Sequence, residues 1–150
     1  MLPPSTNAGY EGAPLAAHFL TLLGVLTLVP GLIHSFLPDG GAGVIAGIDL
    51  SRQGATIVSV FAWAGATQIV WGTTLVLASL RYRALVPLLL ALVGVEQALI
   101  ALNLWWLKPS PAGDSPPAAW GTLLALPLIL AALALALRGR RGAPLAAPSR

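Results

Sequence analysis

The fold of this chain is decided by LVPLLLALVGVEQALIALNLWWL, the stretch from Leu85 to Leu107. It is an almost unbroken apolar run of the roughly 20 residues that a helix needs to cross a bilayer. A glutamate, Glu96, lies halfway along the run. Because a carboxyl group is costly inside a membrane, Glu96 is the first candidate for a functional residue.

The composition of the whole chain also indicates a membrane protein. Of its 150 residues 57% are hydrophobic and only 9% are charged, whereas about 25% of a soluble domain is charged. The net charge is +3, but six of the eight basic residues lie in two short clusters beside apolar runs. Such clusters orient a membrane protein and do not form a face for phosphates, so we expect the lipid bilayer as a partner and no nucleic acid.

Three further apolar runs surround the first one, and together they predict four membrane-spanning helices. The expected spans are residues 14–37, 53–80, 84–107 and 118–138. A flexible lead, 1–13, precedes them, and a basic disordered tail, 139–150, follows. We therefore predict an all-α protein with one domain over residues 14–138, an integral membrane four-helix bundle.

The basic residues predict the orientation of this bundle. With a cytoplasmic N-terminus, six basic residues lie inside and only Arg52 and Lys108 lie outside. Loops rich in Lys and Arg stay in the cytoplasm, so both termini are expected there. The loop 38–52 then lies on the external side, and Asp49 or Ser51 in it is expected to cap the second span.

Small residues predict how the first two spans pack. Gly24 and Gly31 share one face of the first span, and Gly65 and Gly72 share one face of the second, because positions three, four and seven apart lie together on a helix. Such faces allow helices in membranes to approach closely. The short turn at residues 81–83 predicts that the second and third spans form an antiparallel hairpin of neighbouring helices.

The polar residues within the spans define the candidate site. A rise of about 1.5 Å per residue places Glu96 near the middle of a core about 30 Å thick, and Gln68 at nearly the same level. We therefore expect a hydrogen bond between Glu96 and Gln68. Glu96 and His34 are the candidate catalytic residues. The candidate binding residues are Gln68, Trp71, Gln97, Asn103 and Asp39.

Plainer interpretations of these residues stay open. The buried amides and the carboxyl can be interhelical hydrogen-bonding groups worth about 1 kcal/mol each. Trp71 can be core packing, and Asp39 and Asp49 can be turn residues. With His34 the two aspartates would need one more ligand to hold a metal. The chain has no cysteine and no cofactor-binding motif, so no cofactor and no metal is predicted.

A resemblance to a known family rests on four features. They are a Pro30-Gly31 step near the end of the first span, the stretch Gly47–Ser51, the small-residue pattern from Ala64 to Gly72, and the tight basic turn. Over roughly residues 15–106 the chain resembles the DoxX-like group of small four-helix bacterial membrane proteins. The resemblance implies a multi-pass protein of the bacterial inner (plasma) membrane, and some such proteins resemble subunits of quinone-linked oxidoreductases. It implies no functional residue.

Three functions fit these observations. The first is a binder of a lipid-like or quinone-like hydrophobic molecule, or an accessory subunit that works as a homodimer or in a membrane complex. The second is an intramembrane enzyme of the isomerase or oxidoreductase type, with Glu96 as proton donor or acceptor. The third is a small proton-coupled transporter, although only one acidic residue lies within the spans.

Overall fold

The computed structural model describes residues 2–109 and 117–138, so the tail predicted at 139–150 lies outside the described residues. The long helices are α1 (Pro14–Phe36), α2 (Gly54–Arg81), α3 (Val86–Leu102) and α4 (Pro117–Arg138). Short turns precede and follow α3, namely η2 (Arg83–Leu85) and the π-helix η3 (Asn103–Leu107). Within these ranges there is no strand. The all-α prediction is therefore confirmed, and each of the four helical segments is long and apolar enough to cross a membrane.

Proline and glycine determine where the helices begin. Pro14 occupies the first turn of α1, where its missing N–H group is not needed for a helical hydrogen bond. α2 begins after Gln53, which adopts the left-handed conformation (φ +55°) and makes no side-chain cap. The expected cap by Asp49 or Ser51 is therefore wrong. Asp49 instead accepts hydrogen bonds from the backbone N and the Oγ of Ser51, both at 2.9 Å, which close a local turn.

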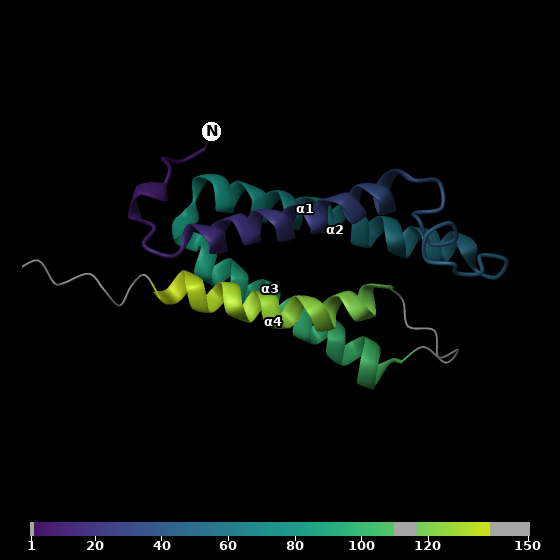
Figure 1. Ribbon diagram of the computed structural model, residues 1–150. Helices are drawn as coiled ribbons and strands as arrows, with labels where there is room; N and C mark the ends of the chain where they lie inside the picture. The colour runs from purple at the N-terminus through teal and green to yellow at the C-terminus, as the bar shows by residue number, and fades with distance from the viewer. Residues whose placement is uncertain (1, 110–116, 139–150) are drawn as a thin grey trace, which may run out of the picture.

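The four helices form two pairs, α1 with α2 and α3 with α4, as Figure 1 shows. α2 and α3 follow each other through a tight turn, yet α2 packs along α1 and scarcely touches α3. The tight turn is present, but the prediction that the two helices it joins pack side by side is wrong. The helices diverge because α2 is held on α1 by close backbone contacts.

Two glycine pairs make these close contacts between α1 and α2. A Cβ atom at Gly72 would lie 2.7 Å from the carbonyl oxygen of Gly24, and one at Gly65 would lie 2.8 Å from the carbonyl oxygen of Gly31. All four glycines are buried. The two faces that the sequence marked as small therefore meet each other, and no side chain separates the two backbones.

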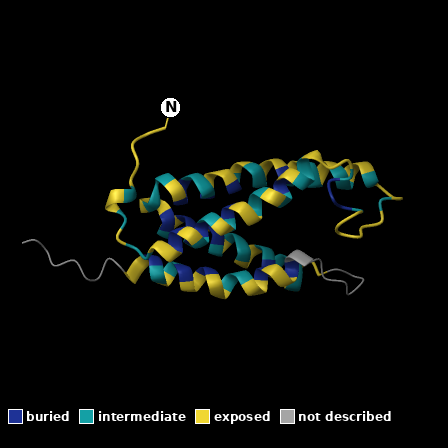
Figure 2. Cartoon of the chain, turned by 45° about the horizontal axis from the view of Figure 1, so that its top comes forward, coloured by how far each residue is buried: buried dark blue, intermediate teal, exposed yellow. Residues whose placement is uncertain are grey.

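The apolar core lies in the half of the bundle nearest the N-terminus. Its buried residues come from all four helices, and Figure 2 shows the buried colour on the inward sides of the helices and the exposed colour on their outward sides. The core consists of Ala16, Ala17, Leu20, Leu75, Ala78, Val86, Leu89, Leu90, Val93, Ile129, Ala132 and Ala136. Exposed Leu, Val and Trp side chains cover the outward sides of all four helices. Such a surface suits lipid rather than water, as in a multi-pass membrane protein.

Residues 3–7 are hydrogen-bonded to the turn between α2 and α3, within the segment 1–13 that the sequence predicted as a flexible lead. The backbone N of Thr6 donates to the carbonyl of Arg81 at 3.1 Å, and Asn7 Nδ2 donates to the carbonyl of Leu80 at 2.7 Å. The Tyr82 hydroxyl donates to the carbonyl of Pro3 at 2.9 Å. The last carbonyls of α2 lack partners within the helix, and the small polar residues of the lead satisfy them.

Candidate binding site

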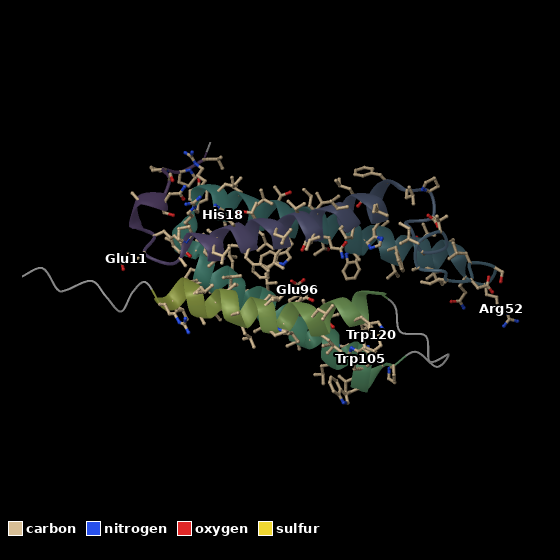
Figure 3. All side chains as sticks on the ribbon, in the orientation of Figure 1. Glu11, His18, Arg52, Glu96, Trp105 and Trp120 are labelled. Carbon is tan, nitrogen blue, oxygen red and sulfur yellow. The ribbon has the colours of Figure 1, made fainter. Side chains whose placement is uncertain are left out.

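Glu96 is held by a tryptophan of the opposite helix pair. Its carboxylate lies between the two pairs in Figure 3, and its Oε2 accepts a hydrogen bond of 2.9 Å from Trp71 Nε1. In the described part of the chain this is the one hydrogen bond between a residue of α2 and a residue of α3. The prediction that Gln68 is the hydrogen-bond partner of Glu96 is wrong. Trp71 lies almost one turn further along α2, and its longer side chain spans the gap that the splayed helices leave.

Gln68 retains a polar atom without a partner. Its Oε1 is buried and forms no hydrogen bond with any described residue. The oxygen and nitrogen of an amide can exchange places on turning, but either orientation leaves a polar atom in that position. A buried carbonyl without a donor costs about 1–3 kcal/mol. Buried polar groups are otherwise almost always satisfied, so this atom is free to accept a hydrogen bond from a ligand or a water molecule.

Two adjoining cavities meet at these residues. An inner cavity of about 370 Å³ is enclosed by all four helices, and a lateral cavity of about 880 Å³ lies between α2 and α3. Both are lined by Gln68, Glu96 and Ile100. Each has the size of a typical small-molecule site. Trp63, which is 74% exposed, borders the lateral cavity, so this cavity opens on the exposed apolar surface of the helices.

His34 lines the inner cavity together with Glu96. Its Nδ1 lies 2.7 Å from the carbonyl oxygen of Gly40. A carbonyl can only accept, so Nδ1 carries the hydrogen, and Nε2 of the neutral ring keeps its lone pair. The ring also meets Phe61 edge to face, with the centroids 5.0 Å apart. These two contacts fix the orientation of the imidazole at the C-terminal end of α1.

Asp39 lies outside both cavities and organises the loop instead. Its carboxylate accepts backbone hydrogen bonds from Gly41 at 2.8 Å, Gly43 at 3.0 Å and Val44 at 2.8 Å. These bonds, that of Val44 foremost, lower the pKa of Asp39 below its ordinary value. Asp39 thus has a structural role in the loop, and its expected role in ligand binding stays a prediction. The described residues contain no group of three His, Asp or Glu side chains placed to hold a metal ion.

The lowered pKa of Asp39 predicts how the loop responds to acid. A depressed pKa in the folded state means that the stabilisation is present above the ordinary value of 3.8 and is lost as the pH falls through the folded pKa. We expect the amide NMR signals of Gly41, Gly43 and Val44 to shift as the pH falls, with a midpoint below 3.8. An Asp39→Ala variant should show shifted signals at every pH, and a midpoint at or above 3.8 would contradict the prediction.

Asn103 and Gln97 extend the polar lining of the site. Asn103 lines the lateral cavity and begins the π-helix η3, and its Nδ2 donates to the carbonyl of Leu99 at 2.8 Å. Gln97 lines the inner cavity. Single π turns inside helices are frequent at functional sites. Six of the seven candidate residues therefore lie around two adjoining cavities, and only Asp39 does not.

Two polar residues of the inner cavity were not singled out as site residues from the sequence. Thr27 and Thr122 both line the inner cavity, and Thr122 is buried. A pattern in the sequence could have identified each of them. Thr27 shares a helical face with His34, seven residues on, and Thr122 is a polar side chain in an otherwise apolar span.

The fold and the site define a class of protein: a small all-helical chain with four helices apolar enough to span a membrane and a partly polar cavity between two helix pairs. No family model, curated protein or solved structure matches this chain. The similarity to DoxX-like proteins therefore stays a prediction from the sequence.

Proposed function

We propose that this protein binds a lipid-like or quinone-like hydrophobic molecule in its two joined cavities, alone or as an accessory subunit of a membrane complex. One observation carries the proposal. Glu96 and the unpartnered Gln68 carbonyl lie together where an enclosed cavity meets an opening between α2 and α3. A polar head group at these residues and an apolar tail along the lateral cavity would fill the space and satisfy the free polar atoms.

The position of the opening supports a ligand that arrives from the bilayer. The lateral cavity lies between α2 and α3, and its lining is mostly apolar apart from Thr67, Gln68, Glu96 and Asn103. A hydrophobic molecule already dissolved in lipid would reach Glu96 sideways without crossing water. The apolar core occupies the other half of the bundle, so the ligand would not displace packed side chains.

The distribution of basic residues supports an orientation with both termini in the cytoplasm of a bacterial cell. Glu11 and His18 lie at the end of the bundle opposite Arg52 (Figure 3). Arg81, Arg83 and Arg138 belong to the same end as Glu11, through the α2–α3 turn and the end of α4. An excess of arginine marks the cytoplasmic side. The cavities would then lie in the outer half of the plasma membrane.

A second candidate function rests on His34. Its Nε2 lone pair and the Glu96 carboxyl border the same inner cavity. Two groups that accept and donate protons around one apolar ligand are the minimum for proton transfer to carbon or oxygen. An intramembrane enzyme of the isomerase or oxidoreductase type would use Glu96 as proton donor or acceptor and His34 as its partner.

The binding proposal is tested by extracting small molecules from purified full-length protein and identifying them by mass spectrometry. Glu96→Gln is compared with Glu11→Gln, which is a matched change at an exposed glutamate far from the cavities. We expect wild type and Glu11→Gln to carry the same hydrophobic molecule and Glu96→Gln to carry clearly less of it. If none of the three carries such a molecule, even after incubation with long-chain quinones and phospholipids, the proposal is wrong.

A further inference from the structure

We infer that the head group of the ligand carries a hydroxyl and that the site selects this hydroxyl over a ketone or an ether. The inference rests on the proposed binding function and narrows its ligand class. It is carried by Gln68 Oε1, a buried acceptor without a donor among the described residues, and by neighbouring hydroxyl, imidazole and indole groups whose hydrogens are already engaged.

Most donors around the cavities are already engaged. Thr27 and Thr122 donate their hydroxyl hydrogens to backbone carbonyls of their own helices, at 2.9 and 2.7 Å. His34 Nδ1 donates to a loop carbonyl at 2.7 Å. The indole N–H of Trp71 donates to Glu96. Only the lone pairs of these side chains remain available to a ligand.

Gln68 Oε1 completes this pattern because it is buried and has no donor. Only an O–H or N–H group can satisfy it. An ammonium group would have to lose its hydration inside an apolar bundle, which costs far more than the loss for a neutral hydroxyl. A hydroxyl is therefore the donor that suits a bilayer-soluble ligand.

The amide nitrogens of Gln68 and Gln97 do not remove this preference. A hydroxyl both donates and accepts, so its oxygen can accept from an amide nitrogen while its hydrogen satisfies Gln68 Oε1. In the orientation that Gln68 has in the structure, a ketone or ether oxygen, which can only accept, would leave Oε1 without a partner. The reduced, hydroxyl-bearing form of a quinone-like molecule should accordingly bind more tightly than the oxidised form.

A matched pair of probes tests the inference. 4-Decylphenol and 4-decylanisole differ by a methyl group on one oxygen, and their binding to full-length protein in detergent is measured by native mass spectrometry. We expect the phenol to bind wild type about tenfold more tightly, as one hydrogen bond in a buried site allows. Gln68→Met should remove the difference. Thr74→Val, on the same helix but lining neither cavity, should keep it.

The outcomes separate this inference from the binding proposal. If neither probe binds the wild type, the proposed function itself is contradicted. If both bind wild type equally, the binding function stands and the hydroxyl preference is wrong, as it would be if a water molecule satisfied Gln68. A preference that persists in Gln68→Met would overturn the role of Gln68. The ratio of the two probe affinities for the wild type tests the hydroxyl preference even if a variant does not fold.

Discussion

Replacing Gly72 by alanine should lower the free energy of unfolding by about 1–3 kcal/mol, the usual cost of overpacking a tight contact. The new Cβ would lie 2.7 Å from the carbonyl oxygen of Gly24 and 2.8 Å from the backbone N of Leu28. Both are backbone atoms, so no side chain can rotate away. α1 and α2 would have to separate along the contact that holds the first helix pair together.

A matched glycine in α4 provides the control. A Cβ at Gly121 would have no neighbour within 4 Å, so Gly121→Ala should be neutral or stabilising by up to about 1 kcal/mol, the gain in helix propensity. Unfolding of the detergent-solubilised protein by heat or SDS, followed by circular dichroism, gives the comparison. Gly72→Ala and Gly24→Ala should be non-additive, because both act at one contact. Equal stability of Gly72→Ala and Gly121→Ala would show that the glycine contact is unimportant.

The helices and the glycine faces of α1 and α2 could be predicted from the sequence because each depends on local pattern, whereas the contact of these two faces with each other was not predicted. An unbroken apolar run fixes a span, and Gly65 and Gly72 fall on one face by the helical repeat alone. Most residues of the candidate site could be predicted for a similar reason. Polar residues in apolar spans turn inward, so Gln68, Gln97 and Asn103 were expected to lie near Glu96.

The partner of Glu96 could not be predicted in the same way. Counting residues from the turn placed Gln68 and Glu96 at one level, but this assumed that α2 and α3 lie side by side. The glycine contact draws α2 towards α1, and the wider gap is bridged by the longer side chain of Trp71. Likewise the roles of Asp39 and of the N-terminal lead depend on loop hydrogen bonds, which no periodic pattern encodes.

The largest functional effect is expected from Glu96→Leu, which should reduce ligand retention at least tenfold, since it removes the carboxylate at the meeting point of the two cavities. On its own this change also leaves the Trp71 indole N–H without an acceptor, which costs about 1–3 kcal/mol. Adding Trp71→Phe removes both partners, and exchanging a hydrogen-bonded pair for apolar groups of similar shape is close to neutral. The double variant should therefore regain stability and still lack the ligand.

This pair of variants separates a functional carboxylate from an interhelical hydrogen-bonding group. If Glu96 serves ligand binding, the double variant is as stable as wild type in thermal unfolding, or more so, because functional polar groups in apolar sites reduce stability. If Glu96 and Trp71 are only a link between the helix pairs, the double variant loses about 1 kcal/mol and the extracted small molecules are those of wild type. Loss of stability with unchanged ligand content would thus reject the binding site, whereas loss of ligand at full stability would show that the Glu96–Trp71 pair, which lines the lateral cavity, acts on a molecule other than this chain.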